Sequence, residues 1–153
     1  MDRRCFVVAA LVAVPALAHH GWSSFDQDKP LYLSGTVKQV RWQNPHAEVV
    51  LAVDTAKLPD GVAARAVPKQ QQSVDGSGLL KRVQVPPNAV GDWEIEFAPL
   101  SRMQAWGLSQ APKIGDRMEL VGYALADSDK RVLRVEYLFF NGKAYAFRSS
   151  PAT

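Results

Sequence analysis

Residues 93–107 read WEIEFAPLSRMQAWG, and this stretch decides the fold. Apolar and acidic side chains alternate over 93–97, which predicts a strand with one buried face. Residues 101–104 then match the capping-box pattern of a helix start, and Gly107 stands where a short helix would end. A strand followed directly by a short helix is therefore expected in the middle of the chain.

Three further strands are predicted after this helix. Residues 117–123 alternate after the Gly115-Asp116 turn, and a second polar turn leads into an apolar run over 132–140. Asn141-Gly142 is the strongest short hairpin signal, so residues 144–147 should pair with the run before them.

Residues 31–53 predict a long strand and a hairpin. Residues 31–42 alternate with a change of parity, which indicates a bulge near Gly35. Gln43-Asn44-Pro45 predicts a turn, and residues 46–53 alternate again beyond it. His46 would lie at the tip of this hairpin.

Residues 54–90 interrupt the pattern with several prolines and glycines, which indicates a long loop insertion, either a functional flap or a mobile segment. Within it, 62–67 could form a brief helix and 83–85 a short strand. The expected order is hairpin, insertion, strand, short helix, strand and hairpin. It predicts a mainly β protein with a small OB-like barrel of five to six antiparallel strands, and a β-sandwich is the alternative.

Residues 1–18 have the three parts of a secretory signal peptide: Arg3 and Arg4, an apolar run, and small residues that end at Ala18. Cleavage there would leave one domain over 19–153 in the periplasm or outside the cell. The apolar run is too short for a stable membrane span, and no later stretch qualifies.

The expected mature chain has no cysteine, because Cys5 lies in the signal segment. Disulfides and thiolate metal sites are therefore excluded. Without residues 1–18, 16 basic and 14 acidic side chains remain of 18 and 15, a nearly balanced charge that argues against nucleic acid as a partner.

Several short motifs give the chain a resemblance to a family. They are His19-His20 after a signal peptide, Phe25-Asp26, Lys29-Pro30, Gly35-Thr36-Val37, Trp42-x-Asn44-Pro45-His46, Trp93-Glu94, a short helix over 100–107, Gly115-Asp116 and Gly122. In these the chain resembles a family of small exported bacterial proteins of unknown function. The resemblance implies an exported protein but no reaction, and the 54–90 insertion departs from it.

Cleavage after Ala18 would make His19 the amino terminus, where its amine and its ring can both bind a metal. With the ring of His46 they would form a three-nitrogen set that suits copper, and His20 would compete as a ligand. Zinc is the second choice and would need Asp26, Glu48 or water as a fourth ligand. The alternative is that the terminal histidines are solvated and that His46 bonds to backbone.

No nucleophile elbow, phosphate loop, zincin helix or dinucleotide fingerprint occurs, so the sequence favours binding over catalysis. The competing hypothesis is a binding module that takes a small molecule or peptide on the barrel face under the insertion. Trp22, Trp42, Trp106 and Tyr123 are the aromatic candidates for that face.

Overall fold

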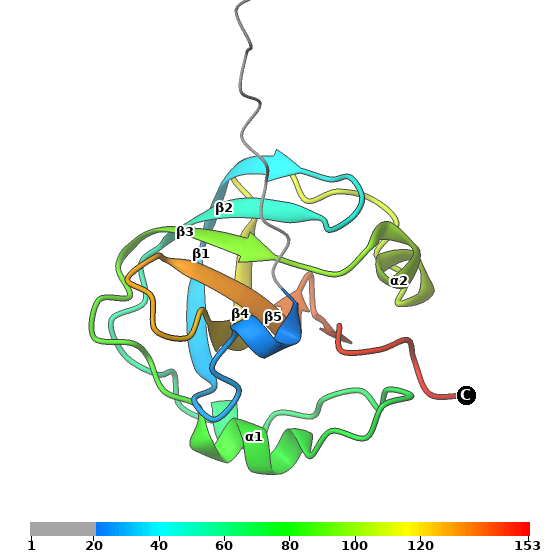
Figure 1. The fold of residues 1–153 in the computed structure, drawn as a ribbon, viewed down its shortest axis with the longest axis horizontal. Coiled ribbons are helices and arrows are strands. Elements are labelled where there is room, and N and C mark those ends of the chain that lie inside the picture. The colour runs from blue at the N-terminus through cyan, green and yellow to red at the C-terminus, as the bar shows by residue number, and fades with distance from the viewer. Residues whose placement is uncertain (1–20) are drawn as a thin grey trace, which may run out of the picture.

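Six strands form one sheet that closes on itself (Figure 1). The computed structural model describes residues 21–153. Its elements in chain order are the 3-10 helix η1 (Trp22–Ser24), β1 (Leu31–Arg41), β2 (Glu48–Val53), the 3-10 helix η2 (Val62–Ala64), α1 (Gly76–Arg82), β3 (Gly91–Glu96), α2 (Leu100–Ala105), β4 (Arg117–Ala124), β5 (Val132–Phe140) and β6 (Lys143–Ala146).

The strand order β3-β2-β1-β4-β5-β6, with an added β3–β5 pairing, closes the first five strands into a barrel. α2 connects β3 to β4, so the predicted OB-like arrangement is confirmed. One detail of the prediction was wrong: β3 and β5 pair in parallel, and the barrel is mixed. Antiparallel neighbours must alternate in direction, and an odd number of strands cannot alternate around a closed ring.

β1 is shared by both halves of the barrel. Leu31–Thr36 pair with β4, and Gly35–Arg41 pair with β2. The predicted irregularity lies slightly later than expected, between Val37 and Gln39. Gly35 has another role: a Cβ there would lie 2.1 Å from the carbonyl oxygen of Ala52, so only glycine allows this close strand contact.

The barrel interior is the main core. Its fully buried side chains alternate with outward-facing ones along each strand. They include Leu33, Leu51, Ile95, Met118, Leu120 and Leu133, and Met103 of α2 is buried in the same core.

The insertion forms a second, smaller core on the outside of the barrel. Val62, Leu79 and Leu80 are buried there against strand residues such as Val121 and Tyr137. Figure 1 shows α1 beneath the barrel in this position. Residues 54–90 are therefore packed against the barrel as part of the domain.

Two local expectations in the insertion need correction. The expected helix over 62–67 is only the short η2, and the expected strand over 83–85 is a single bridge between Gln84 and Leu31. α1 was not expected, because the glycines at positions 76 and 78 obscure the helical pattern in the sequence. The Asp75 side chain accepts a hydrogen bond from the Gly78 amide at 2.9 Å and starts the helix.

Over residues 21–153, none of the helices has the length and apolar character required to cross a bilayer.

Candidate functional site

The first described residues are fastened to the outside of the barrel. The Phe25 side chain is buried, the Asp26 amide donates to the Ala124 carbonyl at 2.9 Å, and the Ala126 amide donates to the Ser24 carbonyl at 2.9 Å. This segment is therefore tied to the connection between β4 and β5, and its path on the surface is fixed.

Trp22 is held by two arginines. Its ring lies 3.8 Å from Cζ of Arg148 and 5.1 Å from Cζ of Arg134, distances typical of cation–π contacts. Arg134 pairs with Glu96 at 3.3 Å, and both side chains are buried. Burial lowers the pKa of Arg134, and the charge of Glu96 opposes that shift.

The other arginine belongs to a buried polar cluster. The Glu136 carboxylate is fully buried and accepts hydrogen bonds from Nε and Nη2 of Arg148, at 2.9 and 2.7 Å. Gln70 of the insertion donates to the same carboxylate at 2.9 Å, and Arg148 also donates to Gln27. The start of the described chain, the insertion and the C-terminal segment thus meet at Glu136.

His46 lies in the connection between β1 and β2 and is half-buried. The Asn44 side chain accepts a hydrogen bond from the Leu100 amide at 3.0 Å, which ties this connection to the start of α2. The Ala47 amide donates to the Ala98 carbonyl, and the Phe97 amide donates to the Ala47 carbonyl. The backbone around His46 is therefore fixed beside the end of β3.

Trp22 and His46 lie on the same side of the barrel. Trp22 contacts Arg134 on β5, Arg134 pairs with Glu96 on β3, and Glu96 stands opposite Glu48 on β2. Their neighbours Val49 and Ile95 are in the main core, so this row of polar side chains faces outward. Glu48 is two residues from His46.

The other predicted ligands, His19 and His20, lie outside the described residues. Within 21–153, no group of three or more His, Cys, Asp or Glu side chains is arranged to hold a metal ion. The carboxylates considered for zinc have other partners: Asp26 pairs with Lys29 at 3.0 Å, and Glu48 pairs with Arg41.

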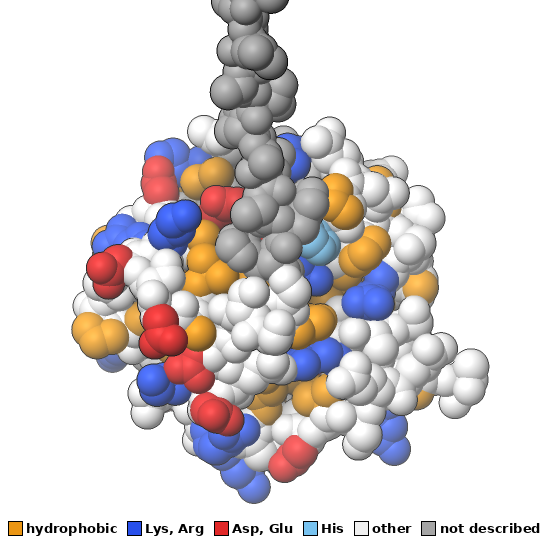
Figure 2. Space-filling view, viewed as in Figure 1, with side chains coloured by type: hydrophobic (Ala, Val, Ile, Leu, Met, Phe, Trp, Pro, Cys, Tyr) orange, Lys and Arg blue, Asp and Glu red, His pale blue; other side chains and the backbone are white. Residues whose placement is uncertain are grey.

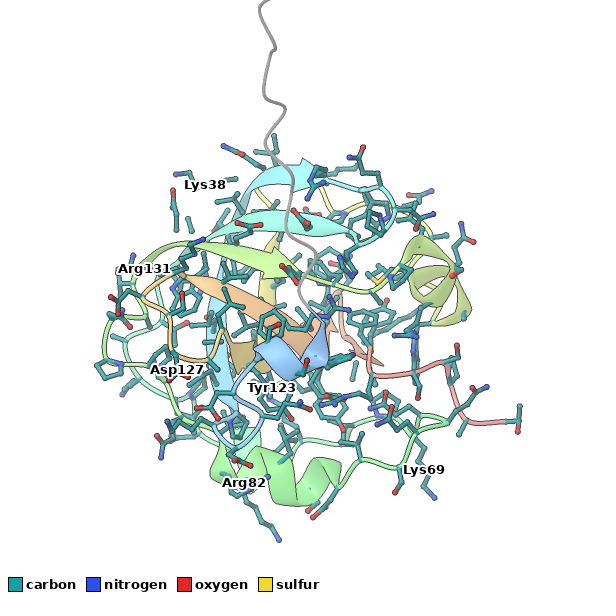
Figure 3. All side chains as sticks on the ribbon, in the orientation of Figure 1. Lys38, Lys69, Arg82, Tyr123, Asp127 and Arg131 are labelled. Carbon is teal, nitrogen blue, oxygen red and sulfur yellow. The ribbon has the colours of Figure 1, made fainter. Side chains whose placement is uncertain are left out.

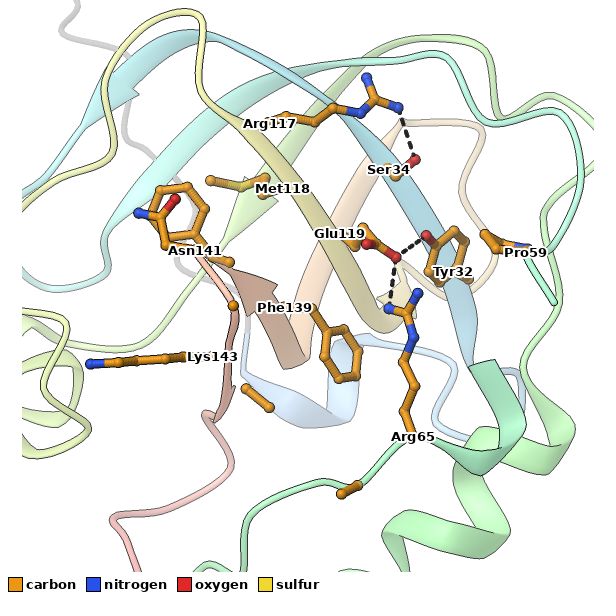
Figure 4. Close-up of a pocket in the computed structure, with 14 residues that line it drawn as sticks. Tyr32, Ser34, Pro59, Arg65, Arg117, Met118, Glu119, Phe139, Asn141 and Lys143 are labelled. Carbon is orange, nitrogen blue, oxygen red and sulfur yellow. Dashed lines mark hydrogen bonds and ion pairs between the residues drawn. The ribbon is translucent and has the colours of Figure 1, made fainter. Parts of the chain in front are cut away.

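A second feature is a hollow of about 660 Å³ between the insertion and the barrel (Figure 4). It is lined by residues of β1, β4, β5 and β6, of the β5–β6 turn and of the insertion. Arg65 pairs with Glu119 at 2.7 Å and lies 4.8 Å over the Phe139 ring, and Tyr32 donates a short hydrogen bond to Glu119. Burial, with Glu119 beside it, raises the pKa of Tyr32 to about 12.

At one side of the hollow Arg117 makes a bidentate pair with Asp54, at 2.7 and 2.8 Å. The Arg117 guanidinium lowers the pKa of the Asp54 carboxyl, although both side chains are largely exposed. Arg65 carried no sequence signal, because it lies in the irregular insertion; Arg117 and Glu119 could have been found as the outward-facing charges of a half-buried strand.

The four aromatic candidates do not line this hollow. Trp42 packs on Phe97 with ring centroids 5.8 Å apart, and Trp106 donates to the Ser149 carbonyl at 2.9 Å. Tyr123 is buried beneath Trp22. These side chains serve packing, which is the commoner role of aromatic residues in small domains.

The described residues define a class: a small, closed, mixed β-barrel of OB topology with one outer face covered by an insertion. Residues 7–62 match DUF6152, a family of unknown function. The matched range contains His19, His20 and His46 as well as β1 and β2, and it ends within η2. Neither the curated proteins nor the solved structures contain a match to the chain.

Proposed function

We propose that the protein is exported and that its mature form binds copper at the amino terminus. The ligands are the His19 amine, the His19 ring and the His46 ring, with His20 as a competing ligand. Removal of residues 1–18 creates the terminal amine, so export and metal binding are linked. The compartment is the periplasm or the exterior of the cell.

The observation that carries this proposal is the common position of Trp22 and His46 on the outer side of the barrel. β3 lies between β5 and β2, so two strand spacings, about 10 Å, separate β5 from β2. The three chain steps from Trp22 back to His19 span at most about 11 Å. His46 lies two residues along the chain from Glu48, about 7 Å further, so the three chain steps and the lengths of the two histidine side chains together have to cover the distance.

Copper fits this donor set better than zinc does. Two imidazole nitrogens and an amine suit copper, which also heads the affinity order for such sites. Zinc usually takes a fourth protein ligand or water, and Glu48 is engaged by Arg41. Copper is therefore the metal proposed.

The test starts with the intact mass of the exported protein, which should correspond to a chain that begins at His19. Copper titration of this protein is then compared with His46→Ala and with a form that carries one extra glycine before His19. Each change should weaken copper binding more than about tenfold, the lower bound for loss of even an outer partner of a ligand.

Gln43→Ala is the matched control, because Gln43 is exposed in the same connection. It should bind copper as the unchanged protein does. Equal affinity in all four forms would refute the three-nitrogen site.

A second candidate function is a binding module for a small molecule. It is favoured by the packed insertion, which covers only part of the outer face and leaves the hollow beside Arg65 open. Figure 2 shows side chains of both charges on the viewed face, and the charge balance gives no support to nucleic acid.

A further inference from the structure

The hollow beside Arg65 exists because the insertion covers only part of an outer strand face. Val121 and Tyr137 lie under the insertion and are buried. Two residues along the same strands, on the same face, Glu119 and Phe139 line the hollow instead, and they stand opposite each other in the β4–β5 pairing. A carboxylate and an aromatic ring are therefore placed side by side at the open part of the face (Figure 4).

The charges that face this hollow balance one another. Arg65 pairs with Glu119 at 2.7 Å, and Arg117 pairs with Asp54. Lys143 belongs to the other face of β6, and its ammonium points away from Arg65 in Figure 4. A charged ligand would bring a charge for which the hollow has no free counter-charge, so the hollow favours a neutral ligand.

The Arg65–Glu119 pair still has hydrogen-bonding groups to offer. The Tyr32 hydroxyl and Nη1 of Arg65 contact the same carboxylate oxygen of Glu119, Oε2. Within residues 21–153, Oε1 of Glu119 and the Nε and Nη2 groups of Arg65 form no hydrogen bond, and they are not among the buried side-chain atoms that lack a partner. They are therefore open to solvent, and an acceptor lies beside a set of donors.

Neighbouring hydroxyl groups match this arrangement, because a hydroxyl both donates and accepts. Of two hydroxyls on adjacent ring carbons, one donates to Oε1 of Glu119 and the other accepts from Arg65. Hydrogen bonds to charged groups are stronger than those between neutral groups. The protein groups are also held in advance, the carboxylate by Tyr32 and the guanidinium by the Phe139 ring, so that binding costs little conformational entropy.

Phe139 provides the apolar part of the site. Its ring is partly exposed, the Arg65 guanidinium lies 4.8 Å from the ring centre, and the uncovered part borders the hollow. A sugar ring has an apolar C–H face with hydroxyls at its rim, which matches one aromatic surface with polar groups beside it. A flat heterocycle matches less well, because the other aromatic rings of the hollow, Tyr32 and Phe140, are buried and cannot cover its second face.

We propose that this hollow binds a neutral sugar. Two adjacent hydroxyls bind Glu119 and Arg65, and the C–H face of the sugar ring covers Phe139. The volume of about 660 Å³ lies in the usual range for sites of small ligands. The proposal rests on the second candidate function, a small-molecule module at this hollow, for which it names the ligand class. It does not depend on copper.

Methyl β-glucopyranoside is the probe, and tetrahydropyran, which has a similar six-membered ring without hydroxyls, is the control ligand. Each is titrated into chelator-treated mature protein while backbone amide shifts are followed by NMR. The glycoside should bind with a dissociation constant of about 5 mM or tighter and shift the amides of Ala66 and Phe139. Tetrahydropyran should bind at least about tenfold more weakly, because it cannot make the two hydrogen bonds to charged groups.

Two variants test the named contacts. Arg65→Lys keeps the positive charge beside Glu119, so the ion pair and the fold should be retained, but an ammonium lacks the fork of donors and glycoside binding should weaken roughly tenfold. Phe139→Leu keeps an apolar side chain but removes the aromatic surface, and it should weaken binding roughly threefold. Arg82→Lys, at an exposed position outside the hollow, is the matched control and should have no effect.

The sugar proposal is overturned if the glycoside does not shift the amides of the hollow, if tetrahydropyran binds as tightly, or if Arg65→Lys and Arg82→Lys have equal effects. Uracil, a neutral flat ring, separates the sugar from the module itself. If uracil shifts these amides and the glycoside does not, the ligand class is wrong but the small-molecule module stands. If neither probe shifts them, the second candidate function fails as well. His46→Ala should reduce copper binding and leave glycoside binding unchanged.

Discussion

At the scale of single residues, three tyrosines report on the packing of the outer face. Burial is the main cause that raises the pKa of Tyr32, Tyr123 and Tyr137 to about 12, and nearby carboxylates add to it. All three side chains lie in the second core, between the barrel and the segments that cover it. Their ionisation therefore measures whether that cover is in place.

We predict that these tyrosines stay protonated up to strongly alkaline pH. A pKa raised above its value in the unfolded chain, about 10, means that protonation favours folding. The stabilisation is fully present below pH 10 and is lost as the pH rises through 12. The ultraviolet absorbance of tyrosinate, followed with pH, should show one late-titrating group fewer in Tyr32→Phe. Titration of these three tyrosines near pH 10 in the folded protein would contradict the packed insertion.

At the scale of elements, β1 depends on a glycine at the point where its two pairings overlap. Gly35 stands opposite both Val53 on β2 and Met118 on β4. We predict that Gly35→Ala lowers the free energy of unfolding by at least about 2 kcal/mol, because the added methyl group would meet backbone atoms that cannot move separately.

Gly21→Ala is the control for this change, since its backbone φ is −74° and the nearest atom to an added Cβ is 3.8 Å away. Denaturant unfolding should show no more than a few tenths of a kcal/mol for this variant. Equal stability of the two alanine variants would mean that β1 and β2 can separate locally at Gly35.

The elements that could be predicted from the sequence were those with a periodic pattern. Alternation over 93–97 and the Asn141-Gly142 turn indicated β3 and the last hairpin, and the stop at Gly107 indicated the end of α2. The expected capping box over 101–104 was wrong, because α2 starts at Leu100 after Pro99 and has no side-chain cap. α1 could not be predicted in this way, because its first turn contains two glycines, and the Asp75 cap and contacts with the barrel stabilise it instead.

The two candidate sites also differ in whether a local sequence pattern could predict them. His46 at a hairpin could be predicted from its turn, and the structure places it on the side of the barrel where the described chain starts. The hollow at Arg65 could not be predicted, because it arises where an irregular segment ends against a strand face. Such a contact has no local signature in the sequence.

At the scale of the whole molecule, the barrel alone does not account for the fold, because one buried carboxylate joins three segments outside it. Glu136 on β5 binds Arg148 near the C-terminus and Gln70 in the insertion. Through Arg148 it also supports Trp22 at the start of the described chain. Figure 3 shows Lys69, next to Gln70, on the insertion in the lower part of the view, and Tyr123, which contacts Trp22, above it over the barrel.

We predict that Glu136→Gln lowers the free energy of unfolding by about 3 kcal/mol, because it leaves the Arg148 guanidinium without its counter-charge in a buried site. Amide hydrogen exchange should quicken over 22–27, 69–72 and 147–151 together, while the barrel strands keep their protection. Glu94→Gln, an exposed change on β3, is the control and should alter neither quantity. Faster exchange in only one of the three segments would show that Glu136 does not couple them, and Trp22 would then be held in place independently of Glu136.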